Sequence, residues 1–389
     1  MRLAILASHP IQYQAPLFRE LARLVDLEVY FCHRSNGGDQ ADAGFGIPFD
    51  WDIDLLSGYP HTFLNNVSRQ PGLSNFSGCD TPTIGNNLTK FAPEALLVLG
   101  WHLKSFWQGI WAAKSRGIPV MVRGDSQLET PRSLMKRVGK SLTYPIGLRF
   151  FDAALYVGER SRRYWEHYHY PQDRLFSSPH CVDNRWFAQR ATHSARMELR
   201  SRLGITDTEK VLLFAGKLIA RKRPIDLVSA TAKLHANGRQ VIILVAGSGP
   251  LESEMSRAAC SANVRIIQLG FTNQTAMPAA YSACDVLVLP SDASETWGLV
   301  ANEALACGRP IVVSSACGCA PDLAADNRAG RTFSVGNPLA LADAVAGVLD
   351  HPPTQQNIAD KIAQYSIENA VTGIKQALDN ISSPVRIAA

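Results

Sequence analysis

Short apolar runs alternate with longer amphipathic stretches along most of the chain. In the first half, the apolar runs cover residues 3–7, 27–32, 95–99, 119–122 and 153–157. In the second half, they cover residues 211–215, 241–246, 264–269, 286–290 and 310–314. Strands that are apolar along their whole length are typical of parallel sheets that helices cover on both faces. The pattern therefore predicts an α/β fold in which each half of the chain forms its own parallel sheet.

Three segments depart from this alternation. Residues 57–89 are rich in Asn, Ser, Gly and Pro and are predicted to form a long loop, whereas residues 187–201 are polar and Arg-rich and mark a linker. Apolar residues within 354–380 recur at helical spacing, which predicts one or two helices. We therefore expect three units: an N-terminal domain over 1–185, a C-terminal domain over 186–360, and a helical tail over 361–389 that can pack back on the first domain.

Length and composition agree with two domains and exclude several classes of protein. The chain has 389 residues, of which 46% are hydrophobic, and its 39 Lys and Arg against 34 Asp and Glu give a net charge of +5. The basic residues do not form the dense runs that are typical of nucleic-acid binding proteins. No apolar run approaches the roughly 20 residues that span a bilayer, and the first run is too short for a signal peptide. We therefore expect a cytoplasmic protein, either free or at the inner face of the membrane.

The segment from residue 286 to residue 315 carries the strongest chemical signal. A buried strand ends at Pro290, a polar loop follows, and a helix is predicted from about residue 299 to residue 307, with Gly308 as its cap. Glu295 lies in the loop and Glu303 lies about one turn inside the helix. The backbone N–H groups at a helix start lack helical acceptors and can bind phosphate. Here they belong to Trp297, Gly298 and Leu299.

Two glycine turns follow the first two predicted strands of the second half. The run Gly216-Lys217-Leu218 ends one strand, and the run Arg221-Lys222-Arg223 comes just before the next helix. The run Gly247-Ser248-Gly249-Pro250-Leu251 ends the other strand. Glycine lets a ligand approach the backbone closely, and clustered cations suit the dense charge of a nucleoside diphosphate. A solvated basic turn is the alternative for any one of these cations.

Taken together, these segments resemble the retaining glycosyltransferases of family 4, the glycosyl transferases group 1 domain on a GT-B fold. Glu295 and Glu303 meet the E-x7-E signature of that family, and the two glycine turns meet its G-[RK]-L and G-x-G-P-L patterns. The resemblance covers about residues 205–345. It implies two Rossmann-like domains whose parallel sheets face each other across a cleft, with the donor on the second domain and the acceptor on the first.

The resemblance also implies roles for single residues. Glu295 would contact hydroxyls of the donor sugar, Glu303 would bind the nucleotide ribose, and Lys217 and Lys222 would neutralise the leaving diphosphate. The expected catalytic residues are Lys217, Lys222, Glu295 and His102, and the expected donor-binding residues are Gly216, Gly247, Gly249, Trp297, Gly298, Leu299 and Glu303. His102 follows the strand at 95–99, where it would reach the donor sugar or the acceptor. A His that only forms a hydrogen bond at a strand end is the alternative.

Three further features allow more than one interpretation. Asp50-Trp51-Asp52-Ile53-Asp54 resembles a metal-binding DxD motif, but its alternation fits a half-exposed strand equally well, and we assign no metal. Residues 132–144 can form a basic amphipathic helix suited to contact with a membrane surface, with a plain solvated helix as the alternative. His180 and Cys181 stand where relatives carry Asn-Gly, which leaves the role of that turn in domain hinging open.

The sequence thus predicts a retaining, metal-independent hexosyltransferase. It would move a sugar from a UDP- or GDP-sugar to a glycan or lipid-linked acceptor, in the synthesis of a cell-surface polysaccharide or glycolipid. No cofactor is expected, because the nucleoside diphosphate sugar is a co-substrate, and no nucleic acid partner is expected. The alternatives are a GT-B nucleotide-sugar epimerase or phosphorylase, and a non-catalytic protein that binds nucleotide sugars.

Overall fold

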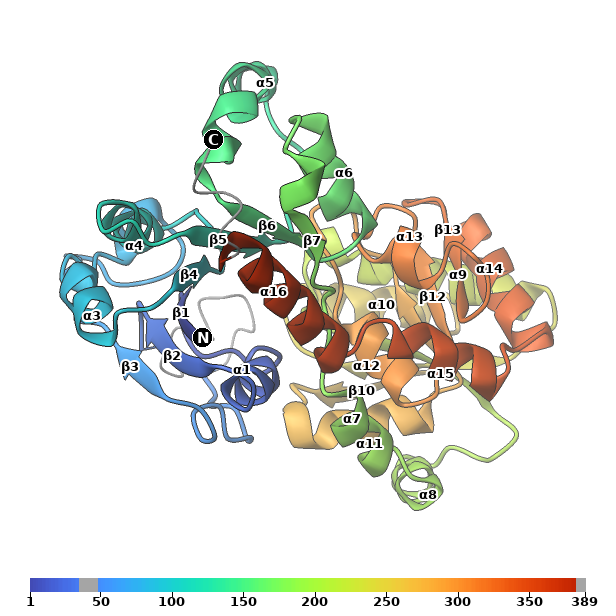
Figure 1. The fold of residues 1–389 in the computed structure, drawn as a ribbon. Helices are drawn as coiled ribbons and strands as arrows, with labels where there is room; N and C mark the ends of the chain where they lie inside the picture. The colour runs from blue at the N-terminus through green and yellow to red at the C-terminus, as the bar shows by residue number, and fades with distance from the viewer. Residues whose placement is uncertain (35–47, 383–389) are drawn as a thin grey trace.

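The structure, a computed structural model, describes residues 1–34 and 48–382 and contains two parallel β-sheets (Figure 1). Within these residues the first sheet has seven strands in the order β3-β2-β1-β4-β5-β6-β7, and all its pairings are parallel. Its strands are β1 (Arg2–Ala7), β2 (Asp26–Phe31), β3 (His61–Phe63), β4 (Ala95–Val98), β5 (Val120–Gly124), β6 (Ala153–Tyr156) and β7 (Leu175–Ser177).

The second sheet comes from the second half of the chain. Over the described residues it has six parallel strands in the order β10-β9-β8-β11-β12-β13. These strands are β8 (Lys210–Ala215), β9 (Val241–Ala246), β10 (Ile266–Gly270), β11 (Val286–Leu289), β12 (Ile311–Ser314) and β13 (Gly330–Phe333). The two sheets match the predicted α/β class with one parallel sheet in each half.

Helices connect the strands, and most of them pack on the sheet faces. In the first half they are α1 (Ala15–Ala22), α3 (Ile84–Phe91), α4 (Lys104–Lys114), α5 (Leu134–Gly147) and α6 (Glu159–His167). Along the chain, α7 (Asn184–Arg190) and α8 (His193–Arg202) come between the last strand of the first sheet and the first strand of the second. The second half contains α9 (Pro224–Ala236), α10 (Glu252–Ser261), α11 (Met277–Ala283), α12 (Val300–Ala306), α13 (Ala320–Leu323), α14 (Pro338–Asp350), α15 (Gln355–Ala363) and α16 (Ile367–Ser382).

Each sheet separates two hydrophobic cores, which explains the continuous apolar runs. In β1, Leu3 and Ile5 pack on one face, whereas Ala4 and Leu6 pack on the other, and all four are fully buried. Successive side chains of a strand point to opposite faces, so a strand covered on both faces must be apolar at every position. The same alternation in β8 divides its residues between the two cores of the second sheet.

Helix α16 returns from the second domain and lies on the first sheet (Figure 1). Its buried face packs in one core with α1 and β1. The hydroxyl of Ser178 donates to the backbone oxygen of Ala370 at 2.9 Å. A Cβ at Gly373 would lie only 1.6 Å from the backbone oxygen of Ser177, so glycine is required for this approach of α16 to β7. Residues 383–389 of the predicted tail lie outside the described residues.

The structure corrects two expectations for the connecting segments. The predicted loop over 57–89 contains β3 and most of α3, and the predicted linker over 187–201 is largely helical, formed by the end of α7 and by α8. β3 is a three-residue edge strand, and only Ile84 and Leu88 of α3 are buried, so neither element shows a clear apolar pattern. Helix α7 spans the predicted domain boundary at residues 185 and 186, and the chain crosses between the sheets just before it.

Helix α5 stands out from the rest of the first domain (Figure 1). No residue of this helix is buried. Among residues 1–34 and 48–382, no helix is both long enough and apolar enough to cross a lipid bilayer.

Candidate active site

The carboxyl ends of the strands in the two sheets face each other across the domain junction. The hydroxyl of Thr296, after β11, donates to the carboxylate of Asp125, after β5, at 2.6 Å. The side chain of Gln127 donates to the backbone oxygen of Ala293 at 3.1 Å. A pocket of about 370 Å³ at this junction has walls from both halves, among them Gln12, Tyr13, Gln274 and Glu303. Ligands of parallel α/β folds bind beyond the carboxyl ends of the strands, so this junction is the candidate site.

The two glycine turns of the second domain lie backbone against backbone. The N–H of Leu218 donates to the backbone oxygen of Ser248 at 2.9 Å. Gly247 has a φ of +150°, and a Cβ there would lie 1.9 Å from the oxygen of Gly216. At Gly249 φ is +154°, and a Cβ would lie 2.6 Å from the oxygen of Leu218. Both glycines are therefore required by the packing of the turns themselves, whatever they also do for a ligand.

Lys222 and Glu295 form an ion pair beside these turns. Lys222 ends the short turn Ala220–Lys222 after the first glycine turn, and Glu295 lies 73 residues later in the loop after β11. The ammonium group donates to the carboxylate, and the two side chains are only 11 and 14% exposed. A Cβ at Gly216 would lie 3.9 Å from Nζ of Lys222. The structure thus brings Gly216, Lys222 and Glu295 together at one place.

Lys217 belongs to the same charged group. Burial lowers the pKa of Lys217, the charges of Arg221 and Lys222 lower it further, and Glu295 opposes them. The exposed Arg221 donates to the backbone oxygen of Ser294 at 3.3 Å, which ties it to the Glu295 loop. These three cations face one carboxylate, so the site holds an excess of positive charge that an anionic ligand would relieve.

A turn after β12 holds the loop that carries Glu295 and Trp297. The N–H of Gly318 donates to the backbone oxygen of Glu295 at 2.9 Å, and the N–H of Cys319 donates to that of Trp297 at 3.1 Å. A Cβ at Gly318 would lie 1.8 Å from the backbone oxygen of Thr296. This close backbone contact fixes the position of Glu295, because the loop cannot shift without breaking both hydrogen bonds.

Helix α12 begins at Val300, one residue later than predicted, and Leu299 is its N-cap without a side-chain hydrogen bond. Gly298 adopts a φ of +102°, and a Cβ there would lie 2.5 Å from the side chain of Leu289. The helix has only seven residues. The predicted binding of the donor by Trp297, Gly298 and Leu299 stays a prediction.

The turn at His180 packs into the same junction. The ring of His180 lies between those of Trp297 and Tyr13, with ring centroids 5.3 and 6.3 Å away. Burial lowers the pKa of His180 to about 3, helped by the charge of Arg123, so the ring is neutral. The side-chain amide of Asn302 in α12 donates to the backbone oxygen of His180 at 3.2 Å. The chain thus crosses between the domains directly beside the Trp297 loop.

Glu303 lies in the pocket at the junction rather than in the Lys222–Glu295 pair. Its carboxylate accepts a hydrogen bond of 2.6 Å from the hydroxyl of Tyr281 in α11, and both side chains are buried. Burial raises the pKa of Glu303 to about 7, and the hydrogen bond from Tyr281 opposes this rise. The sequence-predicted residues therefore form two groups, one around Lys222 and one around Glu303.

His102 lies at the end of β4, on the first-domain side of the junction. Its ring packs against Phe106 with centroids 5.5 Å apart. Burial by surrounding atoms lowers the pKa of His102, while the charge of Asp125 raises it. Asp125 in turn accepts the hydrogen bond from Thr296, next to Glu295. The charge of Asp125 therefore acts on the His102 ring, and the role of His102 toward a substrate stays a prediction.

Residues 50–54 do not form a strand, and Asp50 and Asp52 bridge the two domains. Asp52 accepts hydrogen bonds from the backbone N–H and the hydroxyl of Thr275, and the side chain of Asn273 donates to the backbone oxygen of Asp50 at 2.8 Å. Asp54 caps a turn through Ser57 and Leu56, and these hydrogen bonds lower its pKa to about 2. Over residues 1–34 and 48–382, no three His, Cys, Asp or Glu side chains are grouped to hold a metal ion.

The sequence of residues 195–379 matches the family described as "Glycosyl transferases group 1". The match lies in the second half of the chain and covers just under half of its residues. The matched group 1 segment includes all six strands of the second sheet, the Lys222–Glu295 pair and Glu303.

Among curated relatives, alpha-D-kanosaminyltransferase of Streptomyces kanamyceticus is 27% identical over 272 residues, which are 65% of this chain and 68% of that protein. D-inositol 3-phosphate glycosyltransferase 2 of Catenulispora acidiphila is 32% identical over 180 residues, which are 43% of this chain and 41% of that protein. Further glycosyltransferases are matched over 31–55% of their own length.

A solved structure of HepE from Anabaena, in complex with UDP, matches the whole fold. Its TM-score is 0.73 at 16% identity, over 97% of this chain and 100% of that one. At this identity the likeness shows the fold alone. It confirms the predicted GT-B architecture of two Rossmann-like domains with parallel sheets.

Sequence reasoning missed Asp125, Tyr281 and the buried Arg123 at this site. Arg123 donates to the hydroxyl and backbone oxygen of Ser178 and to the backbone oxygen of Pro179, which anchors the crossing segment. Arg123 is the last residue but one of β5, and Asp125 directly follows the strand. The polar residues after the apolar run at 119–122 were therefore a usable signal, like the one that selected His102. Tyr281 carried no such signal, because an aromatic residue in an amphipathic helix normally indicates packing.

Proposed function

We propose that the chain transfers a hexose from a nucleoside diphosphate sugar to a hydroxyl of a glycan or lipid-linked acceptor, with retention of configuration. The observation that carries the proposal is the convergence of Lys217, Lys222 and Glu295 where the two domains meet. Two cations suit the diphosphate, and a carboxylate suits the hydroxyls of the sugar. The names of the relatives and the UDP in the HepE complex support the same chemistry.

In this mechanism the protein stabilises charge rather than forming a bond to the sugar. As the bond from the anomeric carbon to the diphosphate breaks, positive charge develops on the sugar and negative charge on the leaving phosphate. Lys217 and Lys222 would neutralise that phosphate, and each cation at ~4 Å contributes up to about 4 kcal/mol at an effective dielectric of about 20. The departing phosphate would accept the proton of the acceptor hydroxyl on the same face of the ring, which retains the configuration. Glu295 would hold the sugar in position.

The test is to incubate the protein with a panel of UDP- and GDP-sugars, alone and with candidate acceptors. Slow hydrolysis of one donor and transfer in the presence of acceptor are expected. Conversion of the donor alone into its epimer would establish an epimerase, and a requirement for inorganic phosphate would establish a phosphorylase. Absence of calorimetric binding of both UDP and GDP would support a non-catalytic protein and contradict the proposal.

Removal of divalent cations is expected to leave transfer unchanged. The proposal assigns the neutralisation of the diphosphate to Lys217 and Lys222, so no metal is required for that step. Initial rates with and without EDTA, measured on the donor that the panel identifies, check this expectation. A loss of activity that Mg²⁺ or Mn²⁺ restores would contradict metal-independent transfer.

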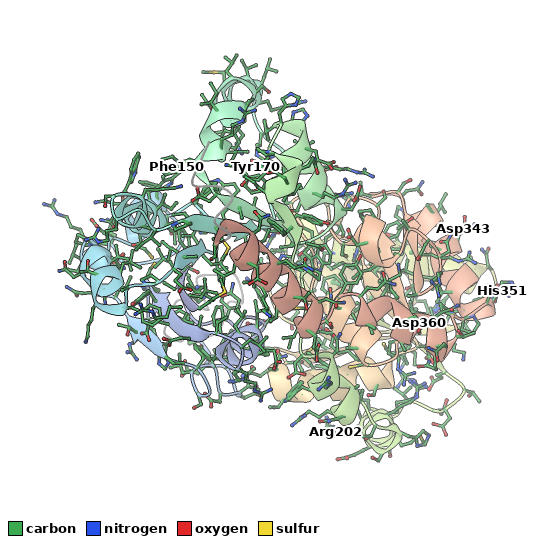
Figure 2. All side chains as sticks on the ribbon, in the orientation of Figure 1. Phe150, Tyr170, Arg202, Asp343, His351 and Asp360 are labelled. Atoms are coloured by element: carbon green, nitrogen blue, oxygen red, sulfur yellow. The ribbon has the colours of Figure 1, made fainter. Side chains whose placement is uncertain are left out.

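We also propose that the enzyme works at the cytoplasmic face of a membrane, held there by α5. The five large apolar side chains of this helix are 51–86% exposed and lie within an arc of roughly 120° at 3.6 residues per turn: Leu134, Met135, Val138, Leu142 and Ile146. The other side of the helix faces the protein, because Lys140 donates to the hydroxyl of Tyr164 at 3.2 Å and the ring of Tyr144 packs on Tyr168. Side chains of α5 project into solvent at the top of Figure 2, above the labelled Phe150.

This orientation is the reverse of that of an ordinary surface helix, whose apolar side faces the core. The segment between Glu129 and Asp152 contains no acidic residue, and its cations are Arg132, Lys136, Arg137, Lys140 and Arg149. Apolar side chains in the acyl region and cations at anionic headgroups are the contacts of an interfacial helix. The exposed face of α5 therefore fits an anionic lipid surface.

Replacing Met135 and Leu142 together by Glu is expected to abolish binding to vesicles that contain anionic lipid, because it places two charges in the apolar face. Transfer to a water-soluble acceptor is expected to remain. Vesicle flotation measures the binding, and Leu339→Glu is the matched control, since Leu339 is 58% exposed on α14 in the other domain. Flotation of the double variant at the wild-type level would contradict the role of α5.

A further inference from the structure

The carboxylate of Glu303 accepts a hydrogen bond from the buried phenol of Tyr281. Glu303 is the one residue of α12 in the wall of the 370 Å³ pocket, whereas Tyr281 does not line that pocket and is fully buried. The 2.6 Å hydrogen bond from the Tyr281 hydroxyl reaches Oε2 of Glu303. Tyr281 thus contacts the carboxylate on the side turned away from any ligand in the pocket.

The Tyr281 ring has little freedom to move. It packs edge-on against Phe187 of α7 with centroids 6.2 Å apart, inside the core that α7, α11 and α12 share. Burial and the neighbouring charge of Glu303 raise the pKa of the Tyr281 phenol well above its usual value. The phenol therefore keeps its proton and acts only as a donor toward Glu303.

A single fixed donor determines what the carboxylate can do. With Oε2 engaged by Tyr281, Oε1 is the oxygen left for a ligand, and the rotation of the carboxylate is restricted. The donor also favours the charged form of a carboxyl group that burial alone would protonate. A charged acceptor of fixed orientation suits a pair of adjacent hydroxyls, such as the 2′ and 3′ hydroxyls of a ribose.

We propose that Tyr281 is a positioning residue that orients Glu303 and keeps it ionised for binding the ribose of the nucleotide. The inference rests on the proposed function, in which a nucleoside diphosphate occupies this junction. Tyr281 itself does not touch the ligand, so its removal acts on the affinity for the nucleotide and not on the chemical step.

The ionisation of Glu303 also predicts a pH dependence of nucleotide binding. Its pKa of about 7 means that the carboxylate becomes charged as the pH rises through 7, and the affinity is expected to rise with it. Removing the phenol donor raises this pKa, so the increase moves to higher pH. Near Glu303, the titratable groups of the protein interior are Tyr281 of α11, Cys284 directly after α11 and Cys307 directly after α12. Those that line the pocket are Tyr13, Arg19, Asp54, Asp183 and Arg190.

The experiment compares UDP and GDP with their 2′,3′-dideoxy analogues in calorimetric titrations. Tyr281→Phe is expected to weaken binding of the preferred nucleotide about 10-fold, as for loss of one hydrogen bond to a charged group, and to leave the dideoxy analogue unchanged. The pH at which the affinity rises is expected to move upward, KM for the donor to rise, and kcat to stay near wild type. Glu303→Gln should remove the pH dependence.

Tyr170→Phe is the matched control, because it removes one buried phenol hydrogen bond, to the backbone oxygen of Phe151, far from the pocket. If Tyr281→Phe weakens the binding of the ribose and dideoxy nucleotides equally, or changes neither affinity, the positioning role is overturned. If the wild-type protein binds neither UDP nor GDP, the proposed function fails together with this inference, so the two failures are distinguished by the wild-type titration alone.

Discussion

Replacing Lys222 by Ala is expected to lower kcat by roughly 10²–10³-fold, the usual cost of removing one group that stabilises developing charge. Lys222 is largely buried beside Gly216, where water cannot replace its charge. Steady-state kinetics on the identified donor measures the effect. Arg221→Ala is the control, since Arg221 is an exposed neighbour in the same turn and should cost about 10-fold or less.

Lys222→Ala also leaves the buried Glu295 without its ion-pair partner, which is expected to destabilise the fold by less than the roughly 3–5 kcal/mol of an uncompensated buried charge, because the charge of Lys217 remains beside it. The double variant Lys222→Ala with Glu295→Gln removes both charges, so it is expected to regain stability in thermal melts while remaining inactive. Near wild-type transfer by a folded Lys222→Ala protein would refute the assignment of the diphosphate site.

Glu295→Gln is expected to lower kcat about 10²-fold while the affinity for the free nucleoside diphosphate rises or stays the same. In the ligand-free protein Glu295 is bonded to Lys222, so a diphosphate must compete with this carboxylate for the ammonium group. Glutamine competes far less, which favours the diphosphate, but it holds the sugar less firmly, and misplacement by about 1 Å can cost 10²-fold in rate.

Kinetics and calorimetry on the same Glu295→Gln preparation separate these two effects. Thr296→Val is the adjacent control, because it removes the hydrogen bond to Asp125 without changing the charge of the site. A nucleotide affinity that falls as far as kcat would show that Glu295 contacts the nucleotide rather than the sugar.

The fold could be predicted from the sequence wherever an element buries both faces. β1, β4, β8, β9, β11 and β12 coincide with apolar runs, and the structure places each of them within its sheet. β2 does so apart from Asp26 at its start and Glu28, which accepts a hydrogen bond from Thr62 of β3. The elements that were not predicted bury little apolar surface. All residues of β3 are only partly buried, and α8 is largely polar. A pattern rule detects burial, so it fails where an edge strand or a surface helix buries little.

The candidate site could be predicted in its residues but not in its contacts. The glycines at 247 and 249 and the two glutamates followed from motif spacing, yet the spacing did not show that Lys222 pairs with Glu295. Nor did it show that Tyr281 lies behind Glu303. Each of these pairs joins elements that are adjacent in space and separated by 22–73 residues along the chain.

By itself, the sequence determined the class of fold, one parallel sheet in each half, and the group 1 signature, because local burial and turn geometry are encoded in neighbouring residues. The tertiary structure alone decided which charges neutralise each other, which side of Glu303 is left for a ligand, and that the apolar side of α5 faces outward. The physical reason is the same in all three cases. Hydrogen bonds and ion pairs act over a few ångströms in space, and only the packing of the two domains sets those distances.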